Sequence, residues 1–390
     1  MAPIYTPYRY LLLLVDFLII VSFVILKLRD KTLLVRLTIP VALYCFILII
    51  STLTVSKGDF SKSVFESLQY ASSILLFFCF NKDTLSNNKV IYTIFGILTA
   101  LILSNFIFFL IHPKGIVSGG SIYYLFDLQN DTPNYIFVYG FFVAIIGTKH
   151  DKLLIPSFII YNACVIQVLF YDYSTGKVGA ILLALLSFFM VFDKDIILKK
   201  IPTVVYALIP SLLFLLICVF RFQNLFEGFI VNVLHEDLTF HSRTYAWDYA
   251  LKAIYKSPFI GYGYTKAKYG YSIIKELSLQ FGHSHSEYFE TMLHTGLIGF
   301  IAFSTPFTLL FRRDNRIRMK KDLTLRTFIL CVFAFLIMAI DETVFCQPFI
   351  IFLGAGIYYS VNISTTPLPV DEKKPKKEKQ HKGKVINEQA

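Results

Sequence analysis

The sequence predicts an all-α integral membrane protein: a polytopic bundle of about eleven (ten to twelve) transmembrane helices with one large extracytoplasmic loop. The 390 residues are 56% hydrophobic and 16% charged, whereas a soluble domain is roughly a quarter charged. The apolar runs are about 17 to 25 residues long, enough for helices to cross a hydrocarbon core. A long polar interval, Arg221–Gly299, interrupts these runs, so chemistry is expected there.

Eleven apolar segments are the predicted spans. The first run has no basic leader or small-residue cleavage site, so it is interpreted as a span and not as a signal peptide. We predict membrane helices 1 to 8 in 1–219, the extracytoplasmic loop bearing the catalytic region in 220–286, helices 9 to 11 in 287–363, and a basic disordered cytoplasmic tail in 364–390. The spans are 10–27, 37–54, 65–80, 90–111, 134–147, 153–170, 178–193, 201–219, 287–311, 323–340 and 348–363.

The basic residues predict the orientation. Most of the 37 lysines and arginines lie in alternate loops, including the Arg312–Lys321 cluster and the tail. By the positive-inside rule these loops are cytoplasmic, which places the amino terminus, the 221–284 loop and the Asp341-Glu342 turn outside. The basic residues are not interleaved with aromatics on one soluble face, so no nucleic-acid partner is expected. Six cysteines, mostly within apolar runs and without a Cys-x-x-Cys pair, are expected to be packing residues.

Within the polar loop, Ser242–Leu251 predicts a helix with a serine N-cap. Trp247, Leu251 and Ile254 share one face, so this helix is expected to lie at the bilayer surface with its tryptophan at the interface. The loop tyrosines suit either sugar stacking or a membrane interface. The Gly261-x-Gly263 segment indicates a turn, because it has no strand and helix around it as in a nucleotide fingerprint.

His285 is the strongest candidate for a catalytic residue. It follows His283 at the outer end of a span and precedes Glu287 and Glu290. A neutral imidazole can take a proton from a hydroxyl, which contributes about 10²- to 10⁴-fold to a rate; a structural histidine is the alternative. Metal binding by the two histidines is disfavoured, because no third ligand is identifiable at fixed spacing.

Lys177 is the second unusual charge. It lies at the outer mouth of the seventh predicted span, where a lysine either snorkels outward or points inward at an anion. Both interpretations remain open from the residues alone.

Four motifs follow one another along the second half of the chain. They are Ser174-Thr175-Gly176-Lys177-Val178-Gly179-Ala180; Ser242-Arg243-Thr244 with Trp247; Pro258 with Gly261-x-Gly263; and His285-Ser286-x-Tyr288-Phe289 with Gly296-Leu297-x-Gly299. In this order they resemble the O-antigen ligase and polymerase superfamily of multispanning bacterial glycosyltransferases. The resemblance covers roughly residues 170 to 300.

The resemblance implies a GT-C-like, metal-independent enzyme that uses no cofactor and takes its sugar from a lipid pyrophosphate donor instead of a nucleotide. Lys177 and Arg243 match two cations thought to hold the pyrophosphate of an undecaprenyl-linked oligosaccharide, and His285 matches the base that deprotonates the acceptor. Lysine replaces the family's usual arginine at position 177, and a lysine is a point charge without bidentate geometry. His283, Trp247, Glu287 and Tyr288 are the predicted supporting residues.

The predicted function is a repeat-unit polymerase that extends a surface polysaccharide, with inversion, at the outer side of the bacterial cytoplasmic membrane. A composition rich in Lys, Ile, Phe and Tyr favours a capsule or exopolysaccharide. Beyond the bilayer, a chain-length regulator and a flippase are partners that the resemblance implies. The alternatives are a ligase with another acceptor, a lipid-linked sugar flippase or other transporter, and a non-catalytic scaffold.

Overall fold

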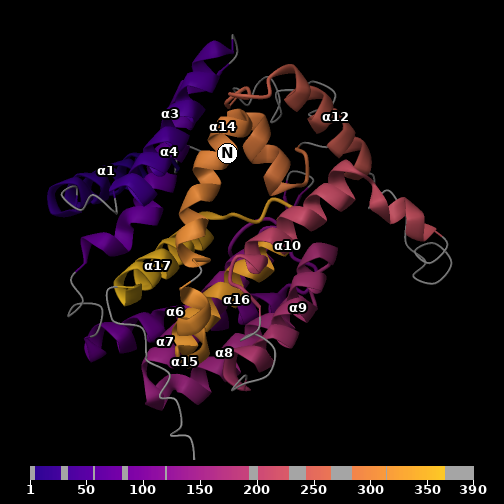
Figure 1. The fold of residues 1–390 in the computed structure, drawn as a ribbon. Helices are drawn as coiled ribbons and strands as arrows, with labels where there is room; N and C mark the ends of the chain where they lie inside the picture. Colours follow the sequence, from indigo (N-terminus) through magenta and orange to yellow (C-terminus); the bar gives the residue numbers. More distant parts are fainter. Residues whose placement is uncertain are drawn as a thin grey trace, which may run out of the picture.

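The computed structural model describes residues 5–27, 34–55, 58–80, 87–118, 121–192, 201–227, 243–264, 283–312 and 314–364. Every predicted span forms a helix, and the all-α prediction is confirmed (Figure 1). The helices at the span positions are α1 (Tyr5–Lys27), η1 with α3 (Leu34–Thr38, Ile39–Thr54), α4 with η2 (Phe60–Leu75, Leu76–Cys79), α6 (Asn88–Ile111), α7 (Thr132–Lys149), α8 (Asp151–Val168), α9 (Ser174–Phe192), α10 with η3 (Val205–Phe214, Leu215–Val219), α14 (Glu287–Leu310), α16 (Leu323–Met338) and α17 (Gln347–Ser364).

Apolar length decides which of these helices can cross a membrane. Five described helical segments are long and apolar enough to do so, and three shorter apolar helices accompany them. Together with their exposed leucine, isoleucine and phenylalanine side chains, these segments are those of a membrane protein. Asp16 is a charged residue in the middle of α1; it is buried and accepts a hydrogen bond from Ser72 of α4 at 2.6 Å.

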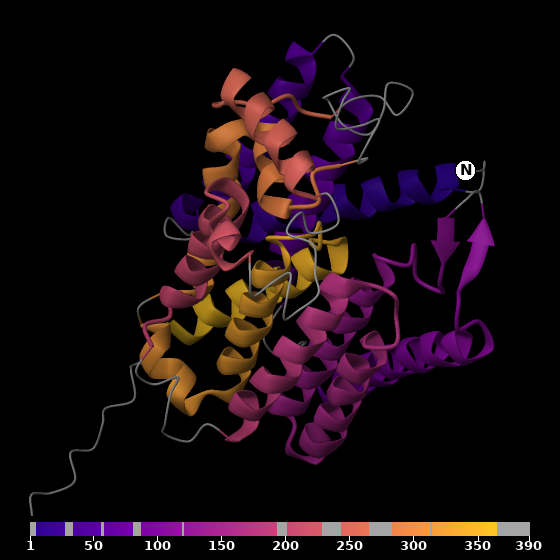
Figure 2. The same ribbon diagram turned by 90° about the vertical axis from the view of Figure 1, so that its right-hand side faces the viewer.

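Helices α16 and α17 form the centre of the bundle. α17 packs on α4, α7 and α14, and α16 packs on α7, α9 and α10, so the pair lies between the N-terminal helices and α6–α9 (Figure 2). Nearly every residue of α16 is buried. Aromatic rings fill this core; the rings of Phe335 and Phe349, for example, stack with centroids 4.5 Å apart.

The connections between helices gather at two opposite ends of the bundle. At one end, the Gln129 side chain donates to the Asp172 carbonyl, and Thr175 at the start of α9 donates to Asp341 after α16. At the other end, Arg326 near the start of α16 donates to the Met190 carbonyl near the end of α9. Because the two helices are antiparallel, the Asp341-Glu342 turn after α16 and the Arg326 contact near the start of α16 lie at opposite ends of the bundle.

Three smaller elements join the span helices. The antiparallel hairpin β1 (Ile116–Ser118) and β2 (Ser121–Tyr123) pairs Ile116 with Tyr123. The 3₁₀ segment η4 (Phe222–Phe226) follows η3, and the short helix α15 (Asn315–Lys321) precedes α16.

The helix predicted in the polar loop forms as α12 (Arg243–Lys256); Ser242 itself lies outside the described residues. The prediction that Trp247 occupies the membrane interface is wrong. Its side chain is buried at 1% exposure, on the face that α12 turns toward α14 and η3, and the Arg221 guanidinium lies 5.0 Å from its ring. Three small neighbours, Ala246, Ala250 and Ala253, are buried with it, so contact with the bundle outweighs any preference of tryptophan for the lipid surface.

A break in α14 brings the segment after α12 against the bundle. Gly296 has φ +62° and ψ −169°, a conformation essentially reserved for glycine. The segment after α12 forms hydrogen bonds with both sides of this break. The Leu297 amide donates to the Pro258 carbonyl, and the Gly263 amide donates to the His294 carbonyl. The glycines of the Gly261-x-Gly263 motif therefore allow close approach of two backbones.

Replacing Gly296 by alanine is expected to destabilise the protein by at least about 2 kcal/mol, because the left-handed backbone resists a side chain. A Cβ there would also lie 2.2 Å from the Phe259 carbonyl carbon. The measurement is thermal unfolding of the purified protein in detergent. Gly96→Ala is the matched control, since a Cβ on this glycine meets nothing within 4 Å and its helix should gain about 0.5 to 1 kcal/mol. Equal midpoints for the two variants would contradict the prediction.

Candidate active site

Arg243, the first residue of α12, organises the site. Its Nη1 donates to Thr175 Oγ1 at 3.1 Å and to the Asp341 carbonyl at 2.6 Å, and it lies 2.6 Å from Asp341 Oδ1. Its Nη2 donates to Glu342 Oε2 at 3.0 Å. One guanidinium thus joins α12 to the first turn of α9 and to the turn between α16 and α17.

The two carboxylates beside Arg243 differ in their electrostatics. Burial raises the pKa of Asp341, and the neighbouring Arg243 does not fully offset this. Burial also acts to raise the pKa of Glu342, but the adjacent His285, together with Arg243 and His283, outweighs the effect of burial and lowers that pKa overall. The surroundings of Glu342 therefore favour its ionised form.

The His285 imidazole also lies next to the Glu342 carboxylate. Its Nδ1 lies 3.4 Å from Glu342 Oε1, and its side chain is 23% exposed. The rings of His283 and His285 lie 4.0 Å apart between centroids, and the His285 amide donates to His283 Nδ1 at 3.1 Å. Burial and the adjacent His285 lower the pKa of His283, so the neutral form of His283 is favoured at pH 7. The predicted base and the predicted second cation therefore share Glu342.

Lys177 stands in the first turn of α9, two residues after Thr175, which contacts Arg243. Its side chain is 44% exposed and its ammonium lies 3.9 Å from Asp172, whose side chain is 96% exposed. Such a pair in solvent contributes little energy, so the ammonium can exchange its partner readily. Lys177 therefore lies at the same end of the bundle as Arg243, and its ammonium is held only by a weak, solvent-exposed ion pair.

The other predicted supporting residues make contacts with neighbouring helices and turns. The Glu287 carboxylate accepts a hydrogen bond from the Phe345 amide at 3.2 Å. Tyr288 donates to the Leu336 carbonyl at 3.2 Å, and its ring stacks on Phe214. Glu287 and Tyr288 also line a cavity of about 200 Å³ between α10, α14 and α16. Trp247 lies one helical turn after Arg243 in α12.

A metal ion has one set of candidate ligands among the described residues: His283, His285 and Glu342, whose ligand atoms all lie within 4.8 Å of one another. Glu342 is the third ligand that spacing alone did not identify. The set fits a cation poorly, because Arg243 holds the second oxygen of Glu342 and a backbone amide occupies Nδ1 of His283. We therefore derive no chemical step from a metal.

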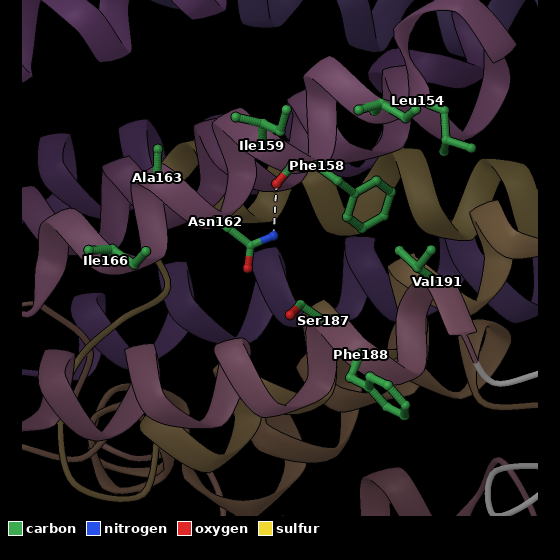
Figure 3. Close-up of a pocket in the computed structure, with 10 residues that line it drawn as sticks. Leu154, Phe158, Ile159, Asn162, Ala163, Ile166, Ser187, Phe188 and Val191 are labelled. Carbon is green, nitrogen blue, oxygen red and sulfur yellow. Dashed lines mark hydrogen bonds between the residues drawn. The ribbon is translucent and has the colours of Figure 1, made fainter.

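A larger groove, of about 700 Å³, lies apart from the site (Figure 3). It runs between α8 and α9 and is lined mainly by aliphatic and phenylalanine side chains. Asn162, one of its polar residues, donates to the Phe158 carbonyl of its own helix at 2.8 Å. The groove contains none of the charged residues around Arg243, so it offers no chemistry.

Sequence reasoning missed three members of the site: Thr175, Asp341 and Glu342. Thr175 lies within the first of the four motifs, but the resemblance assigns no role to it. A signal for the two acids was present, because adjacent carboxylates are unusual in a short turn between two apolar helices. Their partners were not predictable, since Arg243 precedes Asp341 by 98 residues.

The fold and the site define a helical membrane protein with an arginine, a histidine and two carboxylates at one end of its bundle. Residues 160–304 match the model of a family described as O-antigen ligase. The match covers less than half of the chain, and it supports the predicted resemblance of this region to the O-antigen ligase and polymerase superfamily. Comparisons with curated proteins and with solved structures gave no match.

Proposed function

We propose that the protein is a repeat-unit polymerase that transfers an oligosaccharide from undecaprenyl pyrophosphate to a lipid-linked acceptor repeat unit. The observation that carries the proposal is the shared carboxylate: Glu342 lies between the candidate base His285 and the candidate phosphate-binding Arg243. The reaction takes place on the outer side of the bacterial cytoplasmic membrane, with the carboxyl tail on the cytoplasmic side. This orientation rests on the distribution of lysine and arginine.

The proposed step is an in-line displacement. The acceptor hydroxyl oxygen attacks the anomeric carbon of the donor sugar as the bond from that carbon to the pyrophosphate oxygen breaks. The hydroxyl proton passes to His285, and the bonding electron pair leaves with undecaprenyl pyrophosphate. The anomeric configuration is inverted, and no cofactor is consumed.

Glu342 suits the role of a carboxylate that orients a histidine base. An ionised carboxylate beside the imidazole holds the ring and stabilises the imidazolium that forms when the proton arrives. The distance of 3.4 Å between His285 Nδ1 and Glu342 Oε1 is long for a hydrogen bond, and such contacts commonly shorten when substrate binds. The opposite nitrogen, Nε2, is then the atom that accepts the proton.

Arg243 requires a change of partner in this mechanism. Its guanidinium is engaged by Asp341, Glu342 and Thr175, and a cation flanked by two carboxylates attracts an anion weakly. A pyrophosphate entering the site would compete for at least one of these contacts. Lys177, loosely paired in solvent, supplies the second cation, and both would stabilise the charge that grows on the leaving group.

A ligase is the second candidate function, favoured by the description of the matched family. It uses the same donor and the same three side chains, and it differs in transferring the finished glycan to another acceptor. The chain-length regulator and the flippase remain predicted partners that rest on the family resemblance.

The experiment compares the surface polysaccharide of a strain lacking the protein with that of the same strain complemented with the wild-type chain. A polymerase predicts that the null strain accumulates single lipid-linked repeat units at the outer side of the membrane and that complementation restores long chains. Long but unattached chains in the null strain would identify a ligase instead. Single units trapped at the cytoplasmic side would identify a flippase and would reject a glycosyltransferase.

A further inference from the structure

The backbone of His285 is strained. Its φ of +51° places a non-glycine residue in the left-handed region, where the side chain crowds the following carbonyl at a cost of about 1 to 2 kcal/mol. Such a conformation persists only where neighbouring contacts hold it. The identity of those contacts therefore determines where the imidazole lies.

Hydrogen bonds fix the residues on both sides of His285. Before it, the Ser284 amide donates to Glu290 Oε1 at 2.5 Å, and the Ser284 hydroxyl donates to the Ser286 carbonyl at 3.1 Å. After it, the Glu287 amide donates to the Ala339 carbonyl at 3.0 Å. The first of these bonds is the charge-assisted one, because the acceptor is a carboxylate, and such bonds are roughly twice as strong as neutral ones.

Glu290 is itself firmly placed. It belongs to the first turns of α14, where its amide donates to the Ser286 carbonyl at 2.9 Å. Its second carboxylate oxygen lies 3.9 Å from Nε2 of His294, one turn further along the helix. Both side chains are 16% exposed, and the His294 ring lies against Tyr264 with centroids 4.2 Å apart.

We propose that Glu290 is a positioning residue that holds His285 in its left-handed conformation and so directs the imidazole at Glu342. Glu290 does not touch the reacting atoms; it acts by accepting the Ser284 amide. The inference rests on the proposed function in one respect, namely that His285 is the base.

A different role for Glu290 would follow from its charge alone, because an acidic residue in the first turns of a helix stabilises the positive end of the helix dipole. Glutamine separates the two roles. It keeps an oxygen that can accept the Ser284 amide but removes the charge, whereas alanine removes both. The positioning role predicts that Glu290→Gln resembles wild type and that Glu290→Ala does not.

The test has a spectroscopic arm and a kinetic arm, both on the full chain. In protein labelled with ¹³C at histidine, the Cα signal of His285 reports its backbone conformation and is assigned by its loss in His285→Asn. In membranes of the null strain, the rate of chain extension is measured with the lipid-linked oligosaccharide extracted from that strain, using wild type, Glu290→Gln and Glu290→Ala at matched abundance.

We expect Glu290→Ala to move the His285 Cα signal and to lower kcat about tenfold with little change in KM, since relaxing a strain of this size shifts the population by about that factor. Glu290→Gln should return both values most of the way to wild type, because its amide oxygen still accepts the Ser284 amide in a weaker, neutral hydrogen bond. An unmoved Cα signal in Glu290→Ala, or equal defects in the two variants, would overturn the positioning role. If His285→Asn retains full activity, the proposed function fails instead, and the spectroscopic arm still decides whether Glu290 sets the conformation.

Discussion

Replacing His285 by asparagine is expected to reduce chain extension by about 10²- to 10⁴-fold, the contribution of a positioned general base. Asparagine is chosen because it tolerates the left-handed backbone better than most residues, so the loop should keep its shape at φ +51°. Its amide cannot take a proton at neutral pH. The measurement is the length distribution of surface polysaccharide in the null strain expressing the variant.

The matched control for His285→Asn is His112→Asn. His112 is an exposed histidine that follows α6, at the same end of the bundle, and it lies outside the candidate site. The His112→Asn variant should leave the length of the polysaccharide chains unchanged, and both variants should unfold near the wild-type temperature. Long chains from His285→Asn at normal membrane abundance would show that His285 is a structural residue and would remove the base from the mechanism.

Replacing Arg243 by alanine is expected to give the largest loss of stability together with loss of activity. The change leaves Glu342, whose side chain is 5% exposed, without its cation. Removing one partner of a buried pair costs about 3 to 5 kcal/mol, and the lower end of that range applies because the Asp341 side chain is 34% exposed. Thermal unfolding in detergent measures the loss of stability, and chain extension in membranes measures the loss of function.

A double variant separates the structural role of Arg243 from its proposed role in binding pyrophosphate. Arg243→Ala combined with Glu342→Gln removes the uncompensated charge, so part of the lost stability should return, whereas activity should fall below that of Glu342→Gln alone. Glu342→Gln alone provides the reference for the cycle. If the double variant regains stability and is as active as Glu342→Gln alone, Arg243 serves folding only.

The positions of the helices could be predicted because they depend on local composition. A helix that crosses lipid must be apolar over its whole length, so each span was visible as a run of residues. The largest differences occur where helix ends carry polar residues. α4 begins at Phe60, five residues before the predicted span, because Asp59 caps it through the Lys62 amide at 3.0 Å; α9 begins at Ser174, so that Lys177 lies inside the helix.

The burial of Trp247 shows why a single helix can be misinterpreted. Its spacing with Leu251 and Ile254 correctly indicated an apolar face, but the same pattern suits a lipid surface and a protein interior equally well. The choice depended on α14 and η3, which pack on that face.

The sequence by itself thus determined an all-helical membrane protein, the order of its helices and three candidate side chains, because these features are encoded in short stretches of chain. The tertiary structure decided how those side chains are connected. Glu342 joins Arg243 to His285 although the three come from distant segments, since the packing of α9, α12, α14 and α16 brings their ends together. Contacts of this kind have no fixed spacing along the chain, and so no sequence pattern could predict them.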